Sequence, residues 1–162
     1  MLTSRLTINV KLDCHNKSLG SQILYQIAEG MLHVDRGWKD QSVNVLLPKT
    51  SSIQGANLVI ARDILPLGMV FSDYVGQQRQ SFKTQLVDCE FLADSAGQID
   101  GREAHFMELS WRSDGRPIFQ VMAMVLHVEN ALLNFTGSIP GRRDQDTRAA
   151  LIAASQSFRF AP

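Results

Sequence analysis

Few residues of this 162-residue chain have the types and spacing of a catalytic or metal site. The chain contains four histidines, His15, His33, His105 and His127. No two of them have the H-x-x-x-H spacing that places two metal ligands on one helix face. Asp13, Cys14 and His15 are adjacent, but neighbours on an extended segment point to opposite sides, which disfavours a shared ion. We therefore predict no metal site.

The sequence also lacks the glycine motifs of common enzymes. No G-x-G, Walker or G-x-S-x-G pattern occurs, so the signatures of dinucleotide binding, phosphate binding and hydrolase elbows are all missing. His105 shares a strand face with Leu109 and Trp111, which favours a packed histidine over a general base. We predict that the protein is not an enzyme and uses no cofactor.

Composition narrows the class of protein further. Sixteen basic and sixteen acidic residues cancel, which argues against a nucleic-acid partner. No apolar run reaches the roughly 18 residues of a membrane span. Cys14 and Cys89 lie far apart and belong to no C-x-x-C pair, and no secretory leader is recognisable. These features predict reduced thiols and a cytoplasmic protein that does not insert into a membrane.

Apolar periodicity predicts the elements that would position any site. Helical spacing is found in two segments, residues 70–86 and 145–158, and the second follows Asp144 as a cap. Strand patterns occur at residues 6–12, 43–47, 56–63, 87–93, 102–112, 118–128 and 131–136. Short turns such as Asp-Gly join the later strands, so they should pair antiparallel. We predict an α+β domain over residues 26–162, preceded by an extension, residues 1–25, that is either an accessory strand or disordered.

One strand pattern is unusual because both of its faces are apolar. In residues 118–128, Met122 and Met124 alternate with Val121, Ala123 and Val125. An antiparallel sheet usually has one face exposed to water, and two helices can cover only one face of such a sheet. We expect both helices on one face and an apolar cradle on the other. The cradle would bind a second copy, a hydrophobic ligand or a hydrophobic segment of another protein, unless the leading strand and loops cover it.

Short motifs along the chain resemble a known family. They include Ile27-Ala28-Glu29-Gly30, Val43-Asn44-Val45, Asn57-Leu58-Val59-Ile60-Ala61-Arg62-Asp63, Tyr74-Val75, Gly101-Arg102-Glu103-Ala104, Leu109-Ser110-Trp111, Ile118-Phe119-Gln120 and Ser157-Phe158-Arg159-Phe160. In this order they resemble the DcrB-like family and, within it, the effector-associated (Eag-type) chaperones of bacterial type VI secretion. The resemblance covers about residues 26–160, and the stretch from Asn57 to Asp63 is its most specific part.

This resemblance implies a homodimer whose sheets form a hydrophobic cradle. Such chaperones hold the N-terminal transmembrane helices of an effector until the effector is loaded on the secretion spike. By position, the resemblance places the polar contacts at Gln78 and Gln120. Met122, which neighbours Gln120 along its strand, adds deformable contact area. The apolar lining would be Val43, Val45, Leu58, Ile60, Phe82 and Leu86.

Two other functions are compatible with the same pattern. A small protein that binds a hydrophobic ligand would use the same concave face, and would need titratable groups such as His105, His127 or Glu108 beside it if it were an enzyme. A structural adaptor would have a flat dimer interface and no cargo. The sequence also leaves open which sheet face is the core and which is the cradle.

Overall fold

A computed structural model describes residues 22–27, 29–49 and 53–161 of the chain. The chain divides into two compact units, Met1–Asp40 and Gln41–Pro162, each of which is described by itself. The predicted leading strand at residues 6–12 lies outside the described residues.

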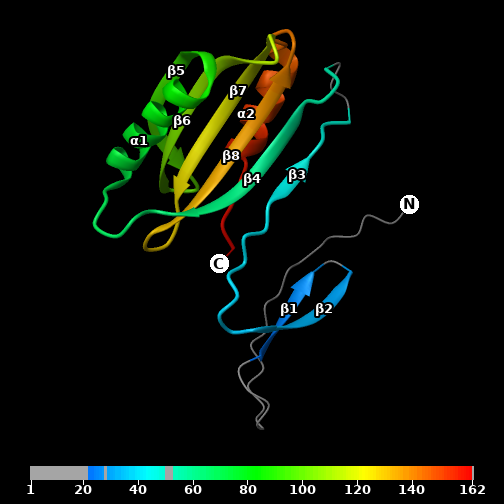
Figure 1. Ribbon diagram of the computed structural model, residues 1–162, viewed down its shortest axis with the longest axis vertical. Helices are drawn as coiled ribbons and strands as arrows, with labels where there is room; N and C mark the ends of the chain where they lie inside the picture. The colour runs from blue at the N-terminus through cyan, green and yellow to red at the C-terminus, as the bar shows by residue number, and fades with distance from the viewer. Residues whose placement is uncertain (1–21, 28, 50–52, 162) are drawn as a thin grey trace. The chain divides into compact units, whose positions relative to one another are not determined.

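In the first unit, the described residues form an antiparallel hairpin of β1 (Gln22–Ile27) and β2 (Gly30–Asp35) (Figure 1). Ile23 faces Val34 across the pair and Tyr25 faces Leu32, so apolar side chains share one side of the hairpin. The predicted boundary after residue 25 falls inside β1, whereas the two compact units separate after Asp40.

The second unit is a six-stranded antiparallel sheet with two helices, so the predicted α+β class is confirmed (Figure 1). The strand order is β3-β4-β8-β7-β6-β5. The strands are β3 (Asn44–Leu46), β4 (Asn57–Ile64), β5 (Val87–Ile99), β6 (Arg102–Ser113), β7 (Arg116–Leu126) and β8 (Ala131–Pro140). The helices are α1 (Phe71–Gln85), between β4 and β5, and α2 (Gln145–Gln156), after β8.

Turn chemistry explains why the strands from β5 onward pair in sequence order. Asp100-Gly101 and Asp114-Gly115 are two-residue turns in which all four residues have positive φ, between 49° and 74°. Asp and Gly tolerate this conformation, and its twist matches that of the flanking strands. At the start of α2, the Asp144 carboxylate accepts hydrogen bonds from the backbone N–H and the hydroxyl of Thr147, which confirms the predicted cap.

The two helices lie on opposite faces of the sheet (Figure 1). Phe71 and Val75 of α1 pack in one cluster with Met124 of β7. Leu151 of α2 packs in another cluster with Val121 of the same strand. Because neighbouring positions on a strand point to opposite faces, the odd-numbered and even-numbered residues of β7 pack against different helices. The prediction that both helices cover one face is therefore wrong: both faces of β7 are apolar because each carries a helix.

We call the two surfaces the α1 face and the α2 face. On the α1 face, α1 lies along the β5 side of the sheet and leaves the part nearer β3 and β4 uncovered (Figure 1). On the α2 face, α2 packs against β7 and β8. Helix α2 thus covers the middle strands of the α2 face, whereas the α1 face stays uncovered along the side of β3 and β4.

We predict that Gly137→Ala destabilises the protein by about 1–3 kcal/mol, because overpacking displaces well-packed neighbours. An added Cβ would lie 2.8 Å from Val121 Cγ2 and 3.0 Å from Leu151 Cδ1, so α2 or β7 must move. The control is Gly76→Ala in α1, whose Cβ would meet nothing within 4 Å and should stabilise the helix by about 0.5–1 kcal/mol. Urea unfolding measures both changes; equal effects would show that α2 does not pack on Gly137 as described.

Candidate functional site

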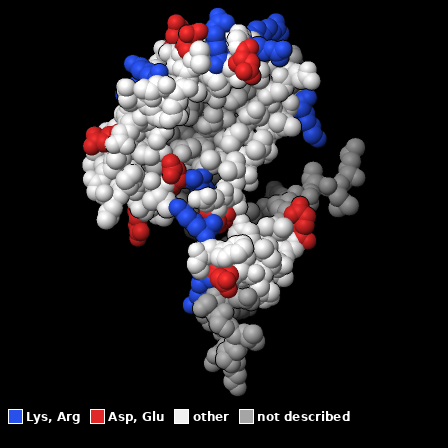
Figure 2. Space-filling view, viewed as in Figure 1, with Lys and Arg blue, Asp and Glu red and all other residues white. Residues whose placement is uncertain are grey.

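The candidate site is the uncovered part of the α1 face, which we call the cradle. Its floor consists of partly or fully exposed side chains from five strands: Val45, Val59, Ala61, Trp111, Ile118, Gln120, Met122, Thr136 and Ser138. None of these side chains carries a formal charge. In the space-filling view this region is a hollow of uncharged residues with Lys, Arg, Asp and Glu side chains around its rim (Figure 2).

Helix α1 forms one wall of the cradle. Gln78, Phe82 and Leu86 follow one another at intervals of four residues, so they lie on one side of the helix. All three are half-buried, and Phe82 packs against the cluster under α1. One turn before them, the buried Tyr74 donates a hydrogen bond to Asp63 at 2.7 Å. Burial, followed by this contact with Asp63, raises the pKa of Tyr74 to about 12, so its hydroxyl stays neutral.

A row of hydrogen bonds crosses the cradle floor from β6 to β8. The Trp111 indole N–H donates to Gln120 Oε1 at 3.1 Å, and Gln120 Nε2 donates to Ser138 Oγ at 3.1 Å. An amide has two N–H donors and two acceptor lone pairs on its oxygen, so Gln120 keeps capacity for one more bond of each kind. The floor of the cradle therefore offers hydrogen-bond donors and acceptors but no formal charge.

Six of the nine predicted site residues lie around the cradle. They are Val45, Gln78, Phe82, Leu86, Gln120 and Met122. Val43 lies just before β3 and is exposed. The other two do not join them: Leu58 is only 4% exposed and packs with Leu151 under α2, and Ile60 packs against the same cluster.

Strand parity explains the two misplaced residues. Val45 of β3 pairs with Val59 of β4, and neighbours directly across a ladder share a face. Val59 and Ala61 therefore reach the cradle, whereas Leu58 and Ile60 point to the α2 face. Both sets are apolar, so the residue pattern offers no contrast by which to choose between them. The register of β3 on β4 was the missing information.

The titratable side chains that an enzyme would need do not converge on the cradle. His105 Nε2 lies 2.5 Å from Asp94 Oδ1, and Arg79 of α1 donates to the other oxygen of Asp94 at 2.6 Å. The His127 ring stacks on Phe160, with ring centroids 4.5 Å apart. Among the described residues, no group of three His, Cys, Asp or Glu side chains could hold a metal ion. No described helix is long and apolar enough to cross a membrane.

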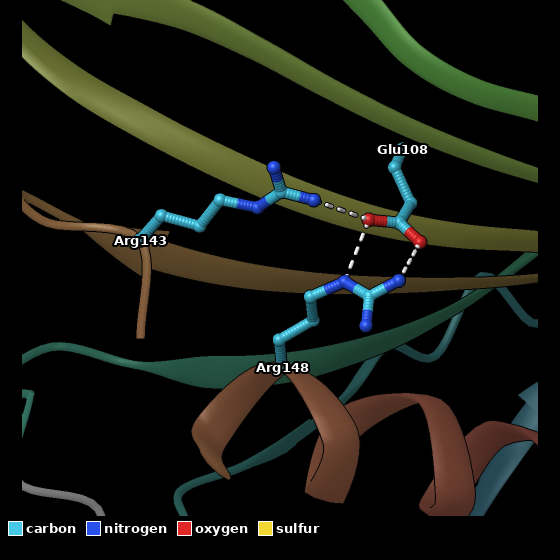
Figure 3. Close-up of polar contacts among 3 residues, drawn as sticks. All are labelled: Glu108, Arg143 and Arg148. Carbon is cyan, nitrogen blue, oxygen red and sulfur yellow. Dashed lines mark hydrogen bonds and ion pairs between the residues drawn. The ribbon is translucent and has the colours of Figure 1, made fainter. Parts of the chain in front are cut away.

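Glu108 belongs to the α2 face, where it holds the helix to the sheet (Figure 3). Arg148 of α2 contacts both carboxylate oxygens, with its Nε 2.8 Å from Oε2 and its Nη2 bonded to Oε1. Arg143 adds a bond to Oε2 at 3.3 Å. These contacts, led by the Arg148 hydrogen bond, lower the pKa of Glu108 below the usual 4.5 of a glutamate. Arg143, in the segment between β8 and α2, is thus engaged within the protein.

Comparison with known proteins places this arrangement in a family. The sequence model of DcrB matches residues 29–157, which include the cradle, both helices and the whole six-stranded sheet. The chain belongs to the DcrB family. It is 30% identical over 96 residues to Effector EagT6 of Pseudomonas aeruginosa PAO1, which covers 59% of this chain and 67% of EagT6. The predicted resemblance to DcrB-like, Eag-type proteins is confirmed.

Solved structures show the same fold. The crystal structure of PA94, a protein of unknown function from Pseudomonas aeruginosa, superposes with a TM-score of 0.74 at 26% identity, over 88% of this chain and 99% of PA94. The solution structure of cyanobacterial PsbP from Synechocystis sp. PCC 6803 matches with a TM-score of 0.52 at 14% identity, over 92% of this chain and 98% of PsbP. The second likeness concerns the fold alone.

We predict that the Glu108 contacts stabilise the DcrB-family fold in a pH-dependent way. Because the folded-state pKa of Glu108 is lowered, its contribution is fully present above about pH 4.5 and is lost as the pH falls through the lower folded value. At pH 7, Glu108→Gln should lower the unfolding free energy by about 1–3 kcal/mol. The difference from wild type should shrink towards pH 3.

The control is Glu103→Gln, an exposed carboxylate on the same strand. Its unfolding free energy should stay within about 0.5 kcal/mol of wild type at every pH. Denaturant titrations at pH 7, 5 and 3 measure both variants. A Glu108→Gln deficit that stays constant down to pH 3 would contradict the described ion pair.

Proposed function

We propose that this protein is a type VI secretion chaperone that holds the N-terminal transmembrane helices of an effector in its cradle. It would do so in the cytoplasm, before the effector is loaded on the secretion spike. Membership of the DcrB family and similarity to EagT6 support the proposal. The observation that carries it is the cradle itself, an apolar sheet face that α1 covers only along one side.

The chemistry of the cradle suits a transmembrane helix. Such helices associate through close packing of small and apolar residues, and side-chain hydrogen bonds add occasional polar contacts. Val45, Val59 and Met122 offer apolar contact area, and the thioether of Met122 adapts to different side chains. Gln78 and Gln120 offer amide groups for the few polar side chains of the cargo.

A homodimer would deepen the cradle and bury further apolar surface. Many large apolar side chains of the described residues are exposed, and contiguous apolar surface of this kind marks interaction sites. In the second unit they include Val43 and Leu47, which flank the edge strand β3. Self-association through a two-fold axis is the commonest way to cover such a surface.

We predict that Val45→Asp abolishes recovery of the effector while Leu46→Asp preserves it. The two residues are neighbours in β3, with exposed fractions of 58% and 53%, but point to opposite faces. A carboxylate at position 45 would have to be desolvated beneath an apolar helix, which is strongly unfavourable. Each variant is co-expressed with an effector that carries N-terminal hydrophobic segments, and the co-purified effector is quantified. Equal recovery with both variants would argue against cargo binding on the α1 face.

We predict a different pattern for Gln120→Ala. In the free protein, Trp111 and Ser138 lose a partner, but both are partly exposed, so water replaces it and the unfolding free energy falls by at most about 1 kcal/mol. Recovery of the effector should fall severalfold, because the lost amide leaves a cargo polar group unpaired in a dry interface. Stability and pull-down are measured on the same preparation. A loss of about 3 kcal/mol with unchanged recovery would make Gln120 a structural residue only.

We also predict a dimer in solution, with a mass about twice the 18.1 kDa of the chain. Light scattering across micromolar concentrations measures this mass without reference to shape. A constant mass near 18.1 kDa would reject self-association while leaving the cradle of each protomer available to cargo.

A further inference from the structure

Exposed aliphatic side chains form a second apolar surface beside the cradle, which we call the end patch. It consists of Leu67, Val70 and Val128, of which Leu67 is fully exposed and the other two are 57% and 54% exposed. Leu67 belongs to the loop between β4 and α1, Val70 is the N-cap residue of α1, and Val128 belongs to the turn between β7 and β8. A soluble protein that leaves adjacent aliphatic residues in water presents a surface for a partner.

The end patch has a fixed scaffold. The Leu65 N–H donates to the carbonyl oxygen of Asn130 at 2.7 Å, and the Asn130 side chain donates back to the Leu65 carbonyl at 3.4 Å. The side chain of Leu65 is buried in the cluster under α1. The loop and the turn are therefore tied to each other and to the core, so the patch is a formed surface.

Its position continues the cradle at one end. Strand β4, which supplies Val59 and Ala61 to the cradle floor, ends at Ile64, and the wall helix α1 begins at Phe71 (Figure 1). The 15 residues of α1 rise about 22 Å, whereas a transmembrane helix of about 20 residues is about 30 Å long. A helix that lies along α1 therefore extends beyond the wall by roughly five residues, and the end patch offers apolar contact for that extension.

The charges around the end patch are negative. Asp73 lies in the first turn of α1, three residues after Val70, and Glu129 directly follows Val128. Both are exposed, and neither forms an ion pair within the described part of the chain. The third carboxylate nearby, Asp63, accepts the Tyr74 hydroxyl. An apolar surface bordered by two free carboxylates complements a segment in which an apolar run is followed by cations.

We propose that the end patch binds the end of the cargo's transmembrane helix together with the Lys/Arg residues that flank it. Transmembrane helices carry such cations on their cytoplasmic side, so this chemistry occurs at one end of the segment. The inference rests on the proposed function and adds a direction to it. The basic flank lies at the start of α1, next to Asp73 and Glu129, and the helix runs from there along the wall.

The test uses two defined probes, each a soluble carrier protein fused to the same 20-residue Leu/Ala segment. One probe carries four lysines beside the segment and the other carries four serines. At an ionic strength of about 0.05 M, the full-length chain should bind the lysine probe about three- to tenfold more tightly. The difference should disappear near 1 M salt, where charges are screened within about 3 Å.

Variants assign the difference to the end patch. Asp73→Asn combined with Glu129→Gln should remove the preference for lysine. The matched control, Asp114→Asn combined with Asp146→Asn, also removes two exposed carboxylates but at the β6–β7 turn and the start of α2, and should keep the preference. Leu67→Ser, at a fully exposed position, should weaken binding of both probes severalfold.

The outcomes separate this inference from the proposed function. If wild type binds both probes equally, or the control variant loses the preference as the Asp73/Glu129 variant does, the end patch does not recognise the flank, and the cradle proposal stands. If neither probe binds while both remain soluble, the cradle proposal fails and this inference fails with it.

Discussion

Strand β7 is apolar on both faces, and the architecture of the second unit depends on how these two faces are covered. On the α2 face, Val121 and Val125 are buried together with Leu151 of α2. On the α1 face, Met124 is buried under α1, but Met122, two residues away, is only half-buried. The chain has one helix for each face, and α1 lies to one side. An apolar area therefore stays open because α1 is held where it is.

Polar contacts near the start and near the middle of the helix keep α1 in that position. Near its start, the Tyr74 hydroxyl donates to Asp63 at the end of β4. Near its middle, Arg79 pairs with Asp94 of β5, which also contacts His105 of β6. A helix held only by apolar contacts could slide across the apolar floor, because hydrophobic burial has no direction. Directional bonds from α1 to β4 and β5 fix the width of the cradle, although each is modest in energy.

Much of this fold could be predicted from the sequence, because local patterns determine it. The two helices, the Asp144 cap and the Asp-Gly turns follow from periodicity and turn chemistry, and they imply an antiparallel sheet. Strand β5 continues to Ile99 rather than ending at residue 93. Most of its last residues are small or polar, but they pair with β6 and so remain in the sheet. Tertiary context here overrides weak strand propensity.

The side of each strand that faces the cradle could not be predicted, because it depends on which helix covers which face. A strand such as β4 has Leu58 and Ile60 on one side and Val59 and Ala61 on the other, and all four are apolar. A shift of one residue in the pairing register exchanges the two sets of side chains between the two faces of the sheet. Gln120 lies on the α1 face and Gln78 lies in α1, and each is a polar side chain inside an apolar row, a contrast that is visible in the sequence without the register.

The same contrast shows what a surface for apolar cargo requires. Under the proposed function the cradle is wetted when empty and dry when occupied, so its polar groups must be solvated in the first state and able to be buried in the second. An unpaired amide costs roughly 1–3 kcal/mol to bury, whereas an unpaired ion costs far more. Gln120 avoids even the smaller cost, because Trp111 and Ser138 already occupy part of its bonding capacity. A floor with paired amides and hydroxyls but no charge can therefore be wetted and still accept an apolar helix, and the charges are kept to the rim (Figure 2).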